Sequence, residues 1–396
     1  MPVLWWAGAG LKPGGSIMGT GIGGAAIARQ TFWEFGSRRL SALLDVCADR
    51  NEAAQFQRVF RQLISPWGDR PLGDGLLRPS SISDDQSPFE FSIGMSRRPI
   101  EVQVYVEPQA DPPGLAGNTR LGRALLNTLA ASLDASLDRL EAVEDLFFPA
   151  AAHEPFGLWI GASWARGRVI ELKAYLNPQA QGPAQTADLM REAARRWGFE
   201  RQWKTLERAA FCRLSDRTEP SIVSLDLSAH SSARVKVYLR CKDASLPELD
   251  ELAAIAADYH PGDADRFYPV VAGHSGPFLD RAPHLEFAFV DAEPVRPAAV
   301  TLEFPIGAHV EHDEVAYERV TRCLSAFGLS TDAYRRALGV FATRSLHERR
   351  GIHAHVTLRR IAVEPRIAVY FAGEAYQPAS PQSTTRQHWK PTKTGK

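Results

Sequence analysis

Short segments in which apolar and polar residues alternate dominate this chain. They form five pairs, and the first members begin near Glu90, Leu158, Val223, His284 and Ile352. Alternation with a period of two is typical of a β-strand that has one dry face and one wet face. A spacing of about 65 residues between pairs indicates a repeated unit. The pattern therefore predicts five β-hairpins, which amounts to ten strands.

The second strand of each hairpin shows the alternation most clearly. These strands are expected at residues 101–107, 171–176, 234–239, 301–304 and 366–371. In each, one face is aliphatic or aromatic, and the other is mostly polar or tyrosine. Arg234, Lys236 and Tyr238, for example, alternate with three aliphatic residues. The ten strands thus share a dry side and a wet side.

The segments between the hairpins carry apolar residues at three- and four-residue steps, which is typical of amphipathic helices. Helices are expected at residues 123–140, 186–197, 246–259 and 313–327. A flat sheet with one wet face would show the same strand pattern. Closure removes the exposed edges of such a sheet, however, and the helices can cover its whole apolar surface. We therefore expect an α+β fold, a closed ten-stranded antiparallel β-barrel with a polar lumen, surrounded by α-helices in five α-β-β-α repeats.

Composition supports one large domain. The chain has 396 residues, and its 44% hydrophobic content is enough to bury a sizeable core. We place a single barrel domain at residues 29–380. The glycine-rich residues 1–28 are expected to form a flexible leader, and the polar residues 381–396 a disordered tail. No stretch resembles a membrane span.

Charge and cysteine content narrow the range of partners. The 46 basic and 46 acidic side chains cancel, so no overall field favours nucleic acid or a membrane, and an anion needs a local cluster of cations. The four cysteines stand far apart, which argues against a disulfide framework and a zinc knuckle. We expect a cytoplasmic monomer or homodimer with small-molecule partners.

Three cations on the wet faces are the strongest candidates for chemistry. Lys173, Arg234 and Lys236 would be costly to bury in a lumen unless an anion such as a diphosphate compensates them. A solvated strand face with a snorkelling lysine is the competing interpretation of any one such residue.

Tyrosines occupy equivalent positions on the same faces. Tyr175 and Tyr238 each follow a candidate cation by two residues, and Tyr370 lies on the last strand. Ring faces around a dry cavity stabilise a carbocation through cation–π contacts. Cations and tyrosines at this spacing suit the ionisation of an allylic diphosphate.

Four motifs in order carry a family resemblance. They are Ser87-Pro88-Phe89-Glu90-Phe91-Ser92, Leu172-Lys173-Ala174-Tyr175, Arg234-Val235-Lys236-Val237-Tyr238 and Ile367-Ala368-Val369-Tyr370-Phe371. From about Phe32 to Pro378 the sequence resembles the indole prenyltransferases of the dimethylallyltryptophan synthase type, whose fold is the α-β-β-α barrel.

The resemblance implies an aromatic prenyltransferase, an enzyme that transfers a dimethylallyl or longer geranyl group. The donor would be an allylic diphosphate, and the acceptor the indole ring of tryptophan or a tryptophan-derived compound. The reaction would be a metal-independent electrophilic substitution. Two alternatives stay open. One is a phenolic acceptor such as tyrosine, and the other is a non-catalytic barrel that binds a phosphorylated hydrophobic ligand.

The resemblance also implies residue roles. Lys173, Arg234 and Lys236 match diphosphate-binding residues, and Tyr175, Tyr238 and Tyr370 match a tyrosine shield around the cation.

Glu90 matches the carboxylate that accepts the indole N–H. Alternation independently turns Glu90 inward, where a carboxylate would stabilise the positive arenium intermediate. The competing interpretation pairs Glu90 with Arg97 or Arg98 at the hairpin turn.

Several positions depart from the family pattern. Gln103 stands where an arginine is usual, Thr301 and Glu303 where a lysine or glutamine and a tyrosine are usual, and Arg366 where another tyrosine is usual. We count Gln103, Thr301 and Arg366 among the diphosphate-site candidates. Arg366 would either replace the lost charge or pair with Glu303.

Further lumen candidates are Glu303, His353, His355 and Trp159, and Trp159 and Trp164 are candidates for the pocket wall. His-x-His on a strand places both rings on one face and suggests a metal site, but we favour a hydrogen-bonded pair.

No metal or other cofactor is expected, and magnesium is not required. Asp84-Asp85 is followed by Gln86, Ser87 and Pro88, so this segment does not match the aspartate-rich magnesium motif of terpene synthases.

Overall fold

The computed structural model describes residues 28–47 and 50–376. The expected tail, and all of the expected leader except Ala28, lie outside the described residues. The boundaries proposed for the domain therefore stay predictions.

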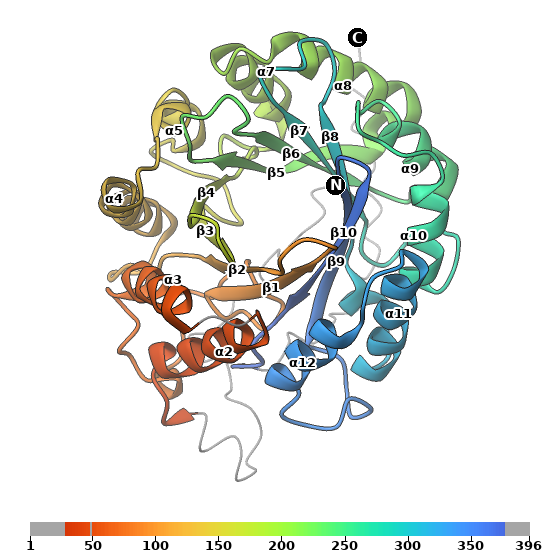
Figure 1. The fold of residues 1–396 in the computed structure, drawn as a ribbon. Helices are drawn as coiled ribbons and strands as arrows, with labels where there is room; N and C mark the ends of the chain where they lie inside the picture. The colour runs from red at the N-terminus through yellow and green to blue at the C-terminus, as the bar shows by residue number, and fades with distance from the viewer. Residues whose placement is uncertain (1–27, 48–49, 377–396) are drawn as a thin grey trace, which may run out of the picture.

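Ten antiparallel strands form a closed barrel, as predicted (Figure 1). Each strand pairs with its neighbours in sequence, and β1 pairs with β10 to close the ring. The strands are β1 (Phe89–Met95), β2 (Glu101–Val106), β3 (Leu158–Ala165), β4 (Glu171–Leu176), β5 (Thr218–Asp226), β6 (Val235–Cys241), β7 (His284–Phe289), β8 (Ala299–Phe304), β9 (His353–Ile361) and β10 (Glu364–Phe371).

The helices surround the barrel as an outer ring, which Figure 1 shows in a view along the barrel. They are α2 (Phe32–Cys47), α3 (Arg50–Ile64), α4 (Leu115–Leu133), α5 (Asp138–Glu141), α6 (Glu144–Phe147), α7 (Thr186–Arg196), α8 (Glu200–Leu214), α9 (Leu246–Ala253), α10 (Asp263–Ala272), α11 (Asp313–Ala326) and α12 (Asp332–Phe341). In the described part of the chain, no helix is long and apolar enough to cross a membrane.

Two of the four expected helices, α7 and α11, end within one residue of the prediction. The first expected helix was placed too late, because α4 ends where Asp134 adopts a left-handed conformation with φ of 52°. The third, α9, is shorter than expected. It ends in tighter turns, in which the amides of Ile255 and Ala256 bond to carbonyls three residues back.

The main hydrophobic core lies between the barrel and the helices. The outward-facing residues of β2, Val102, Val104 and Val106, are fully buried there. Phe89 and Phe91 of β1 join the same core and contact aromatic residues of α2 and α3. Burial of each large apolar side chain stabilises the fold by about 1.5–3 kcal/mol. The dry face of every strand therefore holds the outer helices, and the wet face is left for the lumen.

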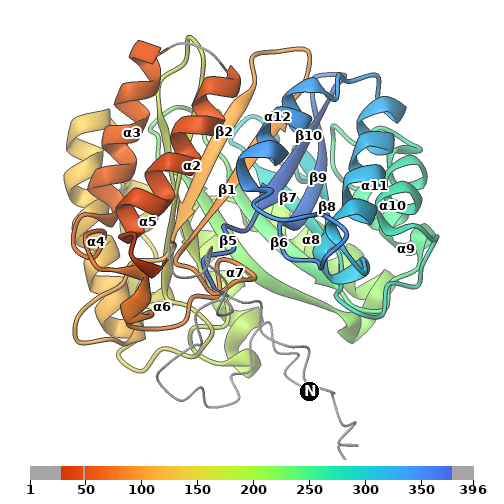
Figure 2. The same cartoon turned by 90° about the horizontal axis from the view of Figure 1, so that it is seen from below.

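The two ends of the barrel differ in their connections. Each odd-numbered strand turns directly into the next even-numbered strand at one end, which we call the hairpin end; the β1–β2 hairpin lies at the top of Figure 2. The helices connect the hairpins through the other end, which we call the helix end. Strand direction therefore decides at which end a lumen side chain lies.

Candidate active site

Cations gather in the lumen toward the hairpin end, and three of them are paired with carboxylates. Arg234 Nε lies 2.7 Å from Asp226 Oδ2. Lys236 Nζ lies 2.8 Å from Glu286 Oε2, and Arg366 Nη2 lies 2.9 Å from Glu101 Oε2.

At Asp226 and Glu101 the charge of the cations outweighs burial, whereas at Glu286 burial dominates and raises the pKa of the carboxyl. Burial raises the pKa of the Asp226 carboxyl, but the charges of Arg234 and Lys173 lower it well below its usual range on balance. Lys236 responds in the opposite way, because burial lowers its pKa to about 8 despite the charge of Glu286.

Two further cations, Lys173 and Arg359, make no ion pair or hydrogen bond with any residue that the structure describes. Lys173 is 7% exposed and lies opposite Asp226 in the β4–β5 register. Arg359 lies opposite Thr301 on β8 and Arg366 on β10. Burial and the neighbouring charges of Arg366 and Arg234 lower the pKa of Arg359 to about 10. An anion that enters the lumen would compensate both cations.

A cavity of ≈ 600 Å³ opens at the hairpin end. Its lining includes Glu101, Asp226, Arg234, Arg359 and Arg366. Mixed polar and apolar walls with convergent charged groups are usual for a small-molecule site. The cavity therefore leads to the lumen cations.

Four tyrosines form a layer in the lumen beside these cations. They are Tyr105, Tyr175, Tyr238 and Tyr370. The ring of Tyr105 lies 5.6 Å from that of Tyr175 and 5.7 Å from that of Tyr370, and the rings of Tyr175 and Tyr238 are 6.5 Å apart. Burial, together with nearby charges, keeps the pKa of each hydroxyl above its ordinary value, so the phenols stay neutral.

Gly161 of β3 makes the room that this tyrosine layer needs. A Cβ at this position would lie 2.8 Å from the ring of Tyr175 and 3.5 Å from that of Tyr105. Both distances are short for carbon atoms, and the first would force the ring to move. The absence of a side chain therefore brings two tyrosines together across β3.

Glu90 lies toward the helix end of the lumen and faces inward, as predicted. It is 8% exposed and stands opposite Tyr105 in the β1–β2 register. Burial, and next the charge of Asp84, raise its pKa well above the ordinary value, although Arg281 opposes them. The alternative that Glu90 pairs with Arg97 or Arg98 is wrong, because those residues lie at the other end of β1, where Arg97 contacts Glu364.

A chain of charged side chains surrounds Glu90. Asp84 Oδ1 accepts a hydrogen bond of 2.9 Å from Arg281, which lies 3.1 Å from His355 Nε2. His355 Nδ1 contacts Glu303, and His284 Nδ1 lies 3.5 Å from the same carboxylate. The helix end is therefore polar but internally compensated.

The sequence and the fold were compared with those of known proteins. The family model described as tryptophan dimethylallyltransferase matches residues 28–259. The chain belongs to this family. It is an aromatic prenyltransferase, and we set aside the alternative of a non-catalytic barrel.

Solved structures support the same assignment. A 6-dimethylallyltryptophan synthase from Micromonospora olivasterospora, in complex with DMASPP and Trp, superimposes with a TM-score of 0.83 at 28% identity, over 89% of this chain and 99% of that one. A 5-dimethylallyl tryptophan synthase from Streptomyces coelicolor, in complex with the same two compounds, gives 0.80 at 28% identity, over 90% and 100%. AnaPT from Neosartorya fischeri, at 17% identity, shares the fold with a TM-score of 0.73 over 86% and 93%.

One expectation about this prenyltransferase is wrong at Arg366. The side chain pairs with Glu101 and not with Glu303. Its guanidinium crosses β1 over Gly94, where a Cβ would collide with it. Gln103 donates to the same Glu101 and accepts from the hydroxyl of Tyr105. A glycine on β1 thus allows an arginine of β10 to reach the position beside Gln103.

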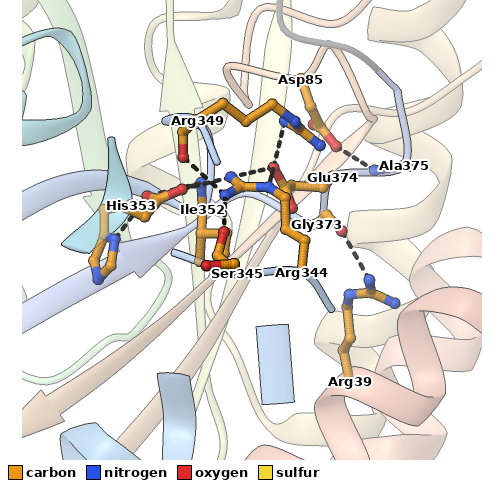
Figure 3. A network of polar contacts seen from close by, with 11 residues as sticks. Arg39, Asp85, Arg344, Ser345, Arg349, Ile352, His353, Gly373, Glu374 and Ala375 are labelled. Carbon is orange, nitrogen blue, oxygen red and sulfur yellow. Dashed lines mark hydrogen bonds and ion pairs between the residues drawn. The ribbon is translucent and has the colours of Figure 1, made fainter. Parts of the chain in front are cut away.

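The expectation for His353 is also wrong, because its side chain does not reach the lumen. The β9–β10 register shifts by one residue after Val369, so His353 stands opposite Phe371, whose ring lies outside the barrel. His353, labelled in Figure 3, has its Nδ1 2.8 Å from Asp313 Oδ1. Its Nε2 lies 2.8 Å from the hydroxyl of Tyr334. A β-bulge therefore separates the two histidines of the His-x-His motif, which cannot share a metal.

The tryptophans divide between the two faces of β3. Trp159 lies in the lumen and stacks on Phe156 at 3.9 Å, beside Ile82. Trp164 lies opposite Val102 and packs in the outer core, although it also borders the cavity at the hairpin end. Only Trp159 is positioned as a wall of the lumen.

Sequence reasoning missed several lumen residues of the prenyltransferase, among them Arg359, Glu286, Tyr105 and Arg281. Extending the alternation by two residues would have found Arg359 beyond Thr357 and Glu286 beyond His284. Tyr105 was on the correct face but was not counted with the shield. Arg281 comes from a loop, and no periodicity marks it.

Proposed function

We propose that this enzyme transfers the dimethylallyl group of dimethylallyl diphosphate to the indole ring of tryptophan without a metal ion. The observation that carries the proposal is the pair of uncompensated lumen cations, Lys173 and Arg359, beside the tyrosine layer. A diphosphate supplies the missing negative charge. The similar synthases in complex with DMASPP and Trp support the choice of donor and acceptor.

Binding and ionisation would involve the same groups. Lys173 and Arg359 would bind the diphosphate oxygens, and Arg234, Lys236 and Arg366 would exchange part of their contact with carboxylates for contact with phosphate. The negative charge on the diphosphate grows as the carbon–oxygen bond breaks, and fixed cations stabilise that change more than they stabilise the intact donor.

The dimethylallyl cation would then lie among the four tyrosines. Their neutral rings offer π faces, and each such contact is worth about 2 kcal/mol in a dry site. The stacked Phe156 and Trp159 form an apolar wall nearby, which excludes water that would otherwise capture the cation. The layer thus both stabilises and protects the electrophile.

Glu90 would orient the acceptor. An ionised Glu90 accepts a hydrogen bond from the indole N–H, and this bond strengthens as the ring becomes positive. A carbon of the ring attacks the allyl cation, a carbon–carbon bond forms, and the ring proton leaves afterwards. Asp84 and Arg281 are close enough to Glu90 to influence its pKa. Their opposite charges would also complement the ammonium and carboxylate groups of an amino acid.

The arrangement of acidic residues supports a metal-independent reaction. Asp84 is engaged by Arg281. Asp85 is fully buried, accepts from the amide and hydroxyl of Ser87, and accepts from the amide of Ala375 at 2.7 Å (Figure 3). Both carboxylates are thus committed to protein contacts, and lumen cations stand where magnesium would otherwise neutralise a diphosphate.

One assay tests the proposal. Purified protein is incubated with dimethylallyl diphosphate and tryptophan in EDTA, and the products are analysed by mass spectrometry. We expect a mono-prenylated tryptophan. Parallel reactions with geranyl diphosphate and with tyrosine test the longer donor and the phenolic acceptor. A product that forms only after magnesium is added would contradict the metal-independent mechanism.

A further inference from the structure

Glu286 is a buried carboxylate to which the proposed transfer of the dimethylallyl group assigns no role. It lies on β7, is 3% exposed, and stands opposite Tyr238 on β6 and Thr301 on β8. Lys236 Nζ lies 2.8 Å from it. A buried negative charge beside a diphosphate site weakens binding of the anion, so this position calls for another explanation.

Glu286 differs from the other two carboxylates that pair with lumen cations. Glu101 and Asp226 both line the cavity at the hairpin end, and Glu286 does not. Its negative charge instead adds to the burial that raises the pKa of Tyr175, Tyr238 and Tyr370. Glu286 is therefore within electrostatic reach of three of the four rings that would hold the allyl cation.

The reaction needs a base at this place. After the ring carbon attacks, it still carries a hydrogen, and a nearby group must accept the proton. Glu90 is occupied by the indole N–H, and the neutral tyrosine hydroxyls are poor proton acceptors. Glu303 is engaged by His355 and His284. Among the carboxylates that the structure describes in the lumen, Glu286 alone combines a place beside the tyrosine layer with a partner that the substrate can remove.

We propose that Glu286 is the catalytic base that takes the ring proton once diphosphate has engaged Lys236. In this step the carbon–hydrogen bond of the arenium ion breaks, and its electron pair restores the aromatic ring. The proton goes to a carboxylate oxygen of Glu286. No oxidant or other reactant is needed, because the diphosphate left in the preceding step.

The surroundings supply both a switch and an exit for the proton. The charge of Lys236 opposes the rise in pKa that burial imposes on Glu286. Diphosphate that binds Lys236 weakens this opposition, so the carboxylate becomes a stronger base when the donor is present. Glu303, whose charge acts on Glu286, also contacts His355, and this pair would give the proton a path toward the helix end.

The inference rests on the proposed function, and isotopes test it separately. Glu286→Gln keeps the shape but removes the base, and general bases contribute about 100-fold or more to rate. We expect kcat to fall by that factor. Ring-deuterated tryptophan should then show a primary isotope effect that the wild-type enzyme lacks, because loss of the ring hydrogen becomes rate-limiting.

A second readout follows the donor. Dimethylallyl diphosphate labelled with oxygen-18 at the bridging position should scramble its label in Glu286→Gln, because the arenium ion reverts before it loses its proton. Glu286→Asp, which retains a carboxylate, should recover part of the rate. Glu101→Gln is the matched control, and it should change the donor KM without an isotope effect.

The outcomes separate the two proposals. If the wild-type enzyme forms no prenylated tryptophan, the proposed function fails. If it does, but Glu286→Gln keeps its rate, or loses rate with neither isotope effect nor scrambling, the base is another group and Glu286 is only the counter-ion of Lys236. Thermal melting of each variant shows whether it is folded.

Discussion

The two ends of the lumen use the same ten strands for opposite electrostatic purposes. At the hairpin end, Lys173 and Arg359 lack any partner among the described residues, and three other cations hold carboxylates that line or adjoin the cavity. At the helix end, Asp84, Arg281, His355 and Glu303 contact one another in a chain.

This difference indicates at which end of the lumen an anionic substrate group would bind. Among the described residues, the hairpin end has two cations, Lys173 and Arg359, without an ion pair, so an anion bound there would have charged partners that offset part of its loss of hydration. The charged groups of the helix end already contact one another, so the proposed role there is that of Glu90 as a hydrogen-bond acceptor for the indole N–H. In the proposed mechanism, the tyrosine layer between the two ends would separate the leaving diphosphate from the acceptor ring that becomes positive.

The largest expected effect comes from removing an uncompensated cation. Lys173→Met should lower kcat/KM by about 1,000-fold, because a fixed group that stabilises charge in the transition state is lost. Steady-state kinetics with varied donor measure this. Lys242→Met is the control, since Lys242 pairs with Glu219 at the far end of β6. Equal losses in both variants would show that the lumen charge has no special role.

A change outside the lumen should affect stability and leave chemistry intact. Asp313 is fully buried and accepts hydrogen bonds from the amides of Ile352 and His353 and from Arg344. Asp313→Ala leaves buried partners uncompensated, which lowers the free energy of unfolding by about 3 kcal/mol. Chemical denaturation measures the change, and kcat well below the melting temperature should not move.

At the helix end, Glu90→Gln should lower kcat/KM by about 100-fold, because a neutral amide stabilises the arenium ion less. The pH profile sharpens this prediction. In its proposed role Glu90 accepts the N–H bond only when ionised, and its pKa is raised, so activity should fall as pH drops through a midpoint above the ordinary carboxyl range. The Glu90→Gln profile should lack that limb. A wild-type profile that is flat through this region would contradict the role of Glu90.

Adjacent arginines on β9 offer a sharper comparison of lumen with exterior. Arg359→Gln removes a charged contact to phosphate worth about 2 kcal/mol, which is roughly 30-fold in kcat/KM. Arg359 is less buried than Lys173, so its effect should be smaller. Arg360→Gln is the matched control, because Arg360 contacts Asp263 on the outer side. A larger loss at Arg360 would reverse the assignment of faces.

The smallest effect is expected at Gly161. Gly161→Ala places a methyl group against Tyr175 and displaces the ring from the tyrosine layer. We expect kcat to fall by about 10-fold, since loss of one contact to the cation is worth about 1–2 kcal/mol. The ratio of prenylated product to dimethylallyl alcohol also measures the change. An unchanged ratio would show that water exclusion does not depend on this ring.

Alternation predicted the barrel because it reflects a physical requirement that applies to every strand. A residue such as Val104 must face the helices and Tyr105 must face the lumen, so the pattern carries the fold. It also placed Lys173, Arg234 and Lys236 correctly on the lumen wall. Which carboxylate each cation contacts depends on neighbouring strands, and one strand's pattern does not contain that information.

Three features could not be read from the pattern. The bulge that turns His353 outward depends on pairing between β9 and β10, where the sequence alternates without interruption. Arg281 reaches the lumen from a loop, whose course is set by contacts with Asp84 and His355 rather than by period. Likewise, the reason why residue 94 must be a glycine becomes visible only in the structure, where the side chain of Arg366 crosses β1 at this position.

The pairing of β1 with β10 has a consequence for synthesis of the protein. The first strand stays unpaired on one side until nearly all of the described chain has been translated. Lys173 and the early tyrosines therefore leave the ribosome long before the wall that completes their cavity. A nascent chain, or one truncated before β10, has no enclosed lumen, so nothing would keep water from capturing an allyl cation. We therefore expect activity only once β10 has paired with β1.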